Sequence, residues 1–79
     1  MTVLEHVGVA TTQLVEAGLP PEVAAFYAEV LARHVLGWDR TTFVCQRRSD
    51  APPAFSVRYA SVLDRRARRE PVALIVGHR

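Results

Sequence analysis

Apolar residues recur at three- and four-residue steps along most of this chain, the spacing that places them on one face of an α-helix. The pattern is interrupted at Gly18, at Gly37, at the Pro52-Pro53 pair and at Pro71. Glycine suits the left-handed residue after a helix end and proline suits a first helical position, so these places separate elements. The expected helices run from a Thr2 cap to Gly18, from Pro21 to Gly37, from an Asp39 cap through Cys45, from Pro53 to the Glu70-Pro71 junction, and from Pro71 to Val76.

Cap chemistry supports two of these helices. Thr2 and Glu5 have the T-x-x-E spacing of a capping box, in which each side chain accepts a hydrogen bond from the backbone of the other residue. Asp39 is a good N-cap for the short third helix. We also expect Trp38, which follows the glycine that ends the second helix, to fold back onto that helix as a core anchor.

The sequence therefore predicts an all-α fold, a compact bundle of about five helices in a single domain over residues 1–79. It shows no strand-like alternation and no internal repeat. A chain this short must share one core among its helices. The residues expected in that core are Leu14, Phe26, Val30, Leu31, Phe43, Tyr59, Leu63 and Ile75, and Val44 is also expected to face inward.

Composition places the chain among ordinary globular proteins, with 49% hydrophobic and 23% charged residues. No apolar run approaches the ~20 residues that span a bilayer, and the N-terminus lacks a basic region ahead of an apolar segment. We therefore expect a cytoplasmic protein with no membrane partner. The ten basic residues are all arginine, and the net charge of +2 implies only a weak attraction to acidic partners.

No catalytic apparatus is visible in the sequence. His6, His34 and His78 have no second ligand at the helical spacing that a metal site needs. The carboxylates have no sequence partner for acid–base work, and glycine-rich phosphate or cofactor loops are absent. The single cysteine, Cys45, excludes an internal disulfide and is expected to be a small core residue rather than a reactive thiol. We expect no catalytic, cofactor-binding or metal residues, so this chain alone is not an enzyme.

Two stretches resemble the N-terminal helical domain of the HemK/PrmC methyltransferases. Residues 65–77 are similar to its closing signature, Arg-Arg-x-x-Gly-Glu-Pro-x-x-Tyr-x-x-Gly, and residues 28–40 follow its pattern of Ala-Glu, apolar residues, His, apolar residues, Gly and Asp-Arg. The resemblance extends from about Leu14 to Arg79. The chain departs from it at Arg69, Leu74 and Val76, which replace Gly, Tyr and Thr. A left-handed arginine costs ~1–2 kcal/mol, so we expect the fourth helix to end differently here.

The resemblance implies that recognition and catalysis belong to separate domains. Members of the family use S-adenosylmethionine to methylate the glutamine amide in the Gly-Gly-Gln motif of peptide chain release factors. Their helical N-terminal domain helps to recognise the release factor, and a separate doubly wound domain holds the cofactor and an Asn-Pro-Pro-Tyr motif. This chain contains no asparagine. Residues 1–79 are thus expected to be a non-catalytic recognition domain of a protein-(glutamine-N5) methyltransferase, whose S-adenosylmethionine-binding catalytic domain is absent.

The resemblance names two partners, a release factor and the domain's own catalytic domain. The residues of this chain add candidates for the contact: the arginines at positions 47, 48, 65 and 68, namely Arg47, Arg48, Arg65 and Arg68. The alternative is that arginines in a last helical turn favour the helix dipole and cover apolar surface with their stems. Arg66 fits that structural role best, because it can reach Glu70 or the last carbonyls.

Two other function classes remain open at this point. One is a free-standing helical protein-interaction module. The other is a small arginine-rich nucleic-acid-binding bundle, which we consider the weaker reading because the charge excess is small. A steep salt dependence of RNA or DNA affinity would favour it, since phosphate neutralisation releases counterions.

Overall fold

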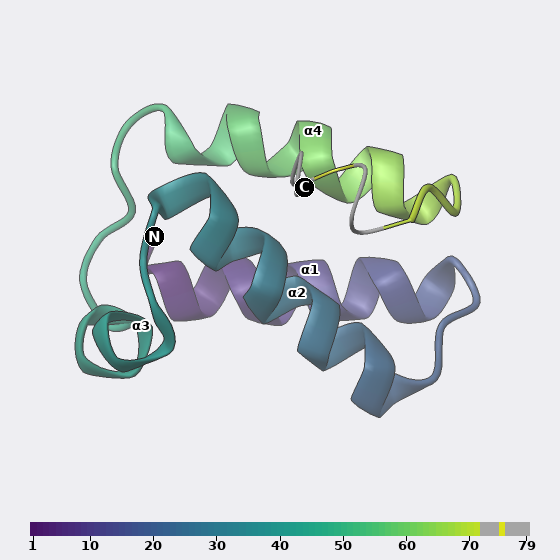
Figure 1. The fold of residues 1–79 in the computed structure, drawn as a ribbon, viewed down its shortest axis with the longest axis horizontal. Coiled ribbons are helices and arrows are strands. Elements are labelled where there is room, and N and C mark those ends of the chain that lie inside the picture. The colour runs from purple at the N-terminus through teal and green to yellow at the C-terminus, as the bar shows by residue number, and fades with distance from the viewer. Residues whose placement is uncertain (72–74, 76–79) are drawn as a thin grey trace.

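The computed structural model describes residues 1–71 and Ile75. The described residues form four helices, which are α1 (Val3–Glu16), α2 (Pro21–Leu36), α3 (Arg40–Gln46) and α4 (Phe55–Ala67) (Figure 1). Among these residues there is no strand, only an isolated bridge between Thr2 and Asp50. The all-α expectation is confirmed. Most of the predicted fifth helix, Pro71–Val76, and its stop at Gly77 lie outside the described residues.

The three long helices meet around α2. In Figure 1, α1 and α4 run side by side across the view, and α2 crosses obliquely in front of α1. α2 contacts both of these helices, whereas α1 and α4 touch each other less. α3 lies at one end of the bundle, near the N-terminus. The radius of gyration is 11.6 Å, in line with the value of about 12 Å expected for a compact chain of this length.

The core side of α2 is built from alanines. Ala24, Ala28 and Ala32 are completely buried, and their four-residue spacing places them on one ridge of the helix. Leu31 and Val35 flank this ridge and are buried too. Because alanine side chains are short, α1 and α4 can approach the backbone of α2 closely. The small core is therefore filled mainly by larger side chains of α1 and α4.

α4 docks on this ridge through Phe55, Tyr59 and Leu63, all of which are buried. The hydroxyl of Tyr59 donates a hydrogen bond of 2.6 Å to the backbone carbonyl of Ala28, so the phenol reaches the centre of α2. Burial raises the pKa of Tyr59 well above its ordinary value. The ring of Phe55 stacks on that of Tyr59 with centroids 4.8 Å apart. This contact fixes both the depth and the register of α4.

The N-termini of α1 and α3 are capped as the sequence predicts. The backbone N–H of Thr2 donates to Glu5 Oε1 at 2.8 Å, and Glu5 N–H donates back to the Thr2 hydroxyl. Asp39 Oδ1 accepts the N–H of Thr42 at 2.7 Å. These N–H donors hold the pKa of the Glu5 carboxyl below 4.5 and that of Asp39 below 3.8, their ordinary values.

Three helices end in the same way, with a left-handed residue. Gly18 and Gly37 have φ of 110° and 71°, and at both ends a 6→1 and a 5→2 backbone hydrogen bond close a Schellman motif. α4 ends identically, but the left-handed residue is Arg69, with φ of 71°. Its N–H donates to the Arg66 carbonyl, and Glu70 N–H donates to that of Arg65. The expectation that α4 ends differently because it lacks the glycine is wrong.

The predicted core is confirmed for six of its eight members, which are Leu14, Leu31, Phe43, Tyr59, Leu63 and Ile75. Phe26 is wrong, since its side chain is 62% exposed, and Val30 is only half-buried and outside the buried core. Both lie on the side of α2 opposite the alanine ridge. Val44 and Cys45 are also exposed, contrary to prediction, because α3 buries only Phe43. Trp38 packs partly buried against the core, as expected.

Enlarging the alanine ridge should destabilise the fold. Ala28→Leu puts three extra carbons into the contact between α2 and α4, and we expect a loss of about 1–3 kcal/mol or more in the free energy of unfolding. Urea denaturation followed by circular dichroism measures it. The matched control is Ala25→Leu on the exposed side of the same helix, with an expected change within about 0.5 kcal/mol. Equal effects of the two substitutions would contradict this placement of α2.

The capping carboxylates should make stability fall in acid. Each has a lower pKa in the folded than in the unfolded chain, so its contribution is present above the unfolded pKa and is lost as pH falls through the folded pKa. Asp39→Asn keeps a capping oxygen without the charge. We expect urea midpoints to fall less between about pH 6 and about pH 3 in this variant than in the parent chain. An unchanged pH dependence would rule out Asp39 as a contributor.

Candidate partner-binding surfaces

The end of α4 forms a compact charged cluster, residues 64–70, here called the arginine turn. Arg65 donates from Nε to Glu70 Oε1 at 3.1 Å, and its Nη2 lies 3.0 Å from the same oxygen. Arg68 Nη1 lies 2.9 Å from Asp64 Oδ2, and its Nη2 lies 3.9 Å from Glu70 Oε2. The turn contains four arginines and two carboxylates, and Arg65 and Arg68 contact the carboxylates. The turn keeps a positive charge, but Arg65 and Arg68 are both held by intramolecular partners.

Arg66 has the structural role that the sequence suggests. Its guanidinium lies over the ring of Tyr27 on α2, 4.4 Å from the centroid, and Nη1 donates to the backbone carbonyl of Glu70 at 3.3 Å. A cation on an aromatic face contributes roughly 0.5–2 kcal/mol, depending on exposure. Arg66 therefore ties the last turn of α4 and the Glu70 backbone to the middle of α2.

Arg69 crosses to the end of α1. Its Nη2 lies 3.5 Å from the carbonyl of Ala17, a long hydrogen bond, and covers Gly18. A methyl group at Gly18 would come within 3.1 Å of that nitrogen. The two left-handed turns, at Gly18 and at Arg69, are thus neighbours in space.

Arg47 and Arg48 follow α3, in the loop that braces the N-terminus of α1. The carbonyls of Arg47 and Ser49 accept the N–H groups of Leu4 and Val3 at 2.8 and 3.1 Å. The loop thereby satisfies two of the donors that a helix start leaves unpaired. This role uses only the backbone, so it leaves both arginine side chains to other contacts. Arg48 is exposed and Arg47 is half-buried.

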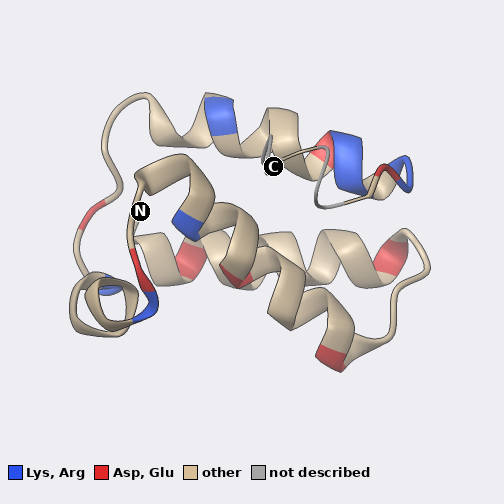
Figure 2. Ribbon diagram, viewed as in Figure 1, with Lys and Arg blue, Asp and Glu red and all other residues tan. Residues whose placement is uncertain are grey.

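The four candidate arginines do not form one patch. Figure 1 places α3 and the loop after it at one end of the bundle and the C-terminal end of α4 at the other, and Figure 2 shows basic residues in both places. The structure brings Arg65 and Arg68 together, and it keeps Arg47 and Arg48 apart from them. A partner that touches all four must therefore span the domain. Whether any of them binds a partner stays a prediction.

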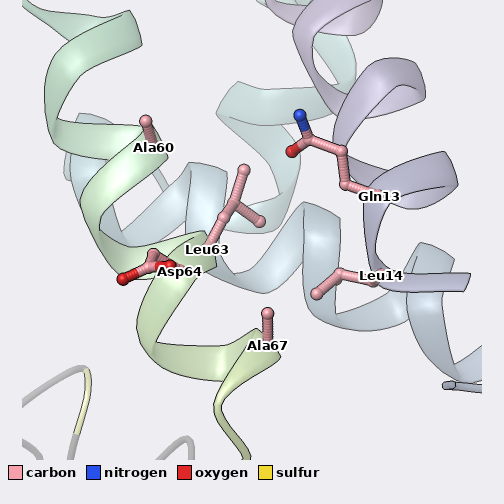
Figure 3. A pocket seen from close by; sticks show the side chains of 6 residues that line it. All are labelled: Gln13, Leu14, Ala60, Leu63, Asp64 and Ala67. Atoms are coloured by element: carbon pink, nitrogen blue, oxygen red, sulfur yellow. The ribbon is translucent and has the colours of Figure 1, made fainter. Parts of the chain in front are cut away.

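A shallow groove of about 330 Å³ separates α1 from α4 (Figure 3). It exists because α4 presents small residues there, Ala60 and Ala67, above the apolar floor of Leu14 and Leu63. Gln13 and Asp64 are the two polar side chains that line it. A smaller hollow continues the groove toward His6. Among the described residues, the larger groove is lined by no Ser, Thr, Cys or His side chain, whereas the smaller hollow includes His6 and Ser56.

No group of three His, Cys, Asp or Glu side chains among the described residues lies close enough to hold a metal ion. No helix in residues 1–71 is long and apolar enough to cross a membrane.

One surface, the back of α2, was not predicted from the sequence, because Phe26 and Val30 were expected in the core. The signal that identifies it is the four-residue spacing of Ala24, Ala28 and Ala32. Small residues at that spacing mark the side where helices approach closely, so the larger apolar residues of the opposite side remain outside.

Comparison with known proteins gives two matches. The model of a family described as the PrmC N-terminal domain matches residues 7–77. The release factor glutamine methyltransferase of Deinococcus radiodurans is 38% identical over 69 residues, which make up 86% of this chain and 24% of that relative. The chain therefore spans about a quarter of the relative's length. No solved structure shows a significant match.

Restoring glycine at the end of α4 should stabilise the domain. Arg69→Gly removes the cost of a left-handed arginine, roughly 1–2 kcal/mol, and loses only the long contact to Ala17. We expect a net gain of about 1 kcal/mol in the free energy of unfolding, measured by urea denaturation. Arg68→Gly, one residue earlier where φ is −82°, is the control and should destabilise. If Arg69→Gly also destabilises, the side chain contributes more than its backbone conformation costs.

Proposed function

The chain belongs to the PrmC N-terminal domain family, and from this membership we propose that it is the non-catalytic recognition domain of a release factor glutamine methyltransferase. The observation that carries the proposal is the family match over residues 7–77, nearly the whole chain. The relative from Deinococcus radiodurans, which bears that enzyme name, supports it. In this proposal residues 1–79 form one helical domain, which acts when joined to a catalytic portion.

The proposal assigns S-adenosylmethionine to the catalytic portion. The residues described here do not fit that cofactor. The α1–α4 groove is shallow and offers one amide and one carboxylate on an apolar floor, with no glycine-rich backbone to approach a nucleoside. We therefore assign no step of methyl transfer to this chain. Its contribution is to hold the peptide chain release factor, in the cytoplasm, in reach of the catalytic portion.

We propose that the four candidate arginines, at positions 47, 48, 65 and 68, provide part of this contact. Arg48 and Arg68 present charge at the two ends of the domain, and Arg47 and Arg65 lie beside them, so a large protein substrate can touch both ends at once. A short peptide cannot. Charges at the rim of an interface chiefly accelerate association, and they do so less at high salt. Recognition of the whole release factor should therefore depend on these arginines more than methylation of its Gly-Gly-Gln segment does.

Charge reversal tests this role. The enzyme is a chimera in which this chain replaces the matching segment of the Deinococcus radiodurans relative. Reversing Arg47, Arg48, Arg65 and Arg68 together to glutamate should lower kcat/KM for a release factor by about tenfold at low salt. The rate on a short Gly-Gly-Gln peptide should stay unchanged, which also shows that the variant is folded. Reversing each pair separately then shows whether both ends contribute.

The matched control is reversal of two other exposed arginines, Arg40 and Arg58. It should leave both substrates nearly unaffected. If the fourfold reversal and the control lower release factor methylation equally, or if the peptide is affected as much as the release factor, the docking role of the four arginines is wrong. A folded chimera that methylates the peptide and shows no preference for the whole release factor contradicts the recognition role itself.

A further inference from the structure

The back of α2 carries an apolar stripe that this domain does not bury. The stripe consists of Val23, Phe26 and Val30, which recur at three- and four-residue steps on the side opposite the alanine ridge. Phe26 is 62% exposed and Val23 37% exposed. A large aromatic side chain left this open has lost most of the hydrophobic stabilisation it would gain by burial. This helix is therefore apolar on both sides, and among the described residues only the alanine side belongs to the buried core.

The stripe ends at a shallow pocket with a cationic rim. The pocket has a volume of about 360 Å³ and is lined by Val30, Arg33, His34, Gly37 and Trp38. The side chain of Arg33 is 29% exposed and lies 3.7 Å from a carboxylate oxygen of Glu29, so its guanidinium contributes positive charge to the rim of the pocket. The surface that fits here is apolar along most of its length, with a carboxylate or carbonyl group at the end that meets Arg33.

The chain itself passes beside this stripe as it leaves α4. Arg66 lies on the ring of Tyr27 and holds the carbonyl of Glu70, and the ring of Tyr27 lies 5.5 Å from that of Phe26. The backbone of Glu70 therefore lies beside α2 next to the stripe, and Ile75, the next described residue after Pro71, is buried in the core. In the relative from Deinococcus radiodurans, about three quarters of the length lies outside the segment that this chain matches.

The size of the stripe decides between possible occupants. Three side chains and the rim of a pocket bury a few hundred square ångströms, whereas stable interfaces between separate proteins bury roughly 800 Å² on each partner. A second copy of the chain would therefore bind weakly. A domain on the same polypeptide needs far less area, because a short link gives an effective concentration on the order of 1 mM.

We propose that the α2 stripe is the surface on which the catalytic portion packs. This inference rests on the proposed function, since it requires that the domain act joined to such a portion. The docked surface is apolar, faces Phe26 and supplies an acceptor to Arg33. Docking fixes the orientation of the recognition domain relative to the catalytic site, and it places the arginine turn at the edge of the junction.

Hydrogen exchange of the α2 backbone amides tests the packing without measuring activity. With a linked effective concentration on the order of 1 mM and an intrinsic Kd on the order of 0.1 mM, the stripe is docked about ten times as often as not. Exchange in α2 should then be about tenfold slower in the chimera than in the isolated 79-residue chain. Phe26→Asp should abolish the difference. Val57→Asp, at a 74% exposed position on α4, should leave it intact.

Other occupants predict different results. Equal rates of α2 amide exchange in the chimera and in the isolated chain overturn the proposal. It is also overturned if Phe26→Asp and Val57→Asp abolish the slowing of exchange to the same extent. Slowing that appears only when a release factor is added assigns the stripe to the substrate instead. A doubled mass of the isolated chain in sedimentation assigns it to a second copy. None of these results depends on methylation, so the proposed function and the packing can fail independently.

Discussion

The close approach of α1 and α4 to α2 is the constraint on which the rest of the structure depends. A chain of 79 residues can bury little surface, and in this domain the three long helices share one core around the small side chains of α2. Ala24, Ala28 and Ala32 provide these small side chains, with no exposure at all. The hydroxyl of Tyr59 reaches the Ala28 carbonyl because nothing larger stands between the helices. The same arrangement turns Phe26 and Val30 outward. The close packing of the core and the exposed apolar stripe on α2 therefore have the same cause.

The second constraint is that each helix must stop abruptly for the chain to return across the bundle. Two stops use glycine, and the third places Arg69 in the same left-handed conformation. The arginine side chains of this last turn then make contacts with α2 and with Glu70. Arg66 lies on Tyr27, Arg65 holds Glu70, and the arginine turn joins α4 to α2 beside the apolar stripe. A local backbone requirement thus places charged and apolar candidate surfaces next to each other.

Sequence reasoning predicted what depends on local chemistry. The Thr2–Glu5 capping box, the Asp39 cap and the glycine stops follow from backbone geometry within a few residues, and the core residues of α4 follow from its clear amphipathic pattern. It was wrong about Phe26 because α2 is apolar on two sides, and only the arrangement of its neighbours decides which side is buried. It could not tell that Arg47 and Arg65 lie at opposite ends, since that depends on the path of the whole chain.

The central claim is that α2 turns its alanines inward and its large apolar residues outward. Nuclear Overhauser effects in the isolated chain test it most directly. Within the described residues, the account predicts contacts between the ring protons of Tyr59 and the alanines of α2, and it places the ring of Phe26 against α2 residues such as Tyr27. It also predicts that a soluble paramagnetic agent broadens the Phe26 ring resonances. Contacts from the Phe26 ring to α1, with the methyl groups of Ala24 and Ala28 accessible to the agent, would contradict it.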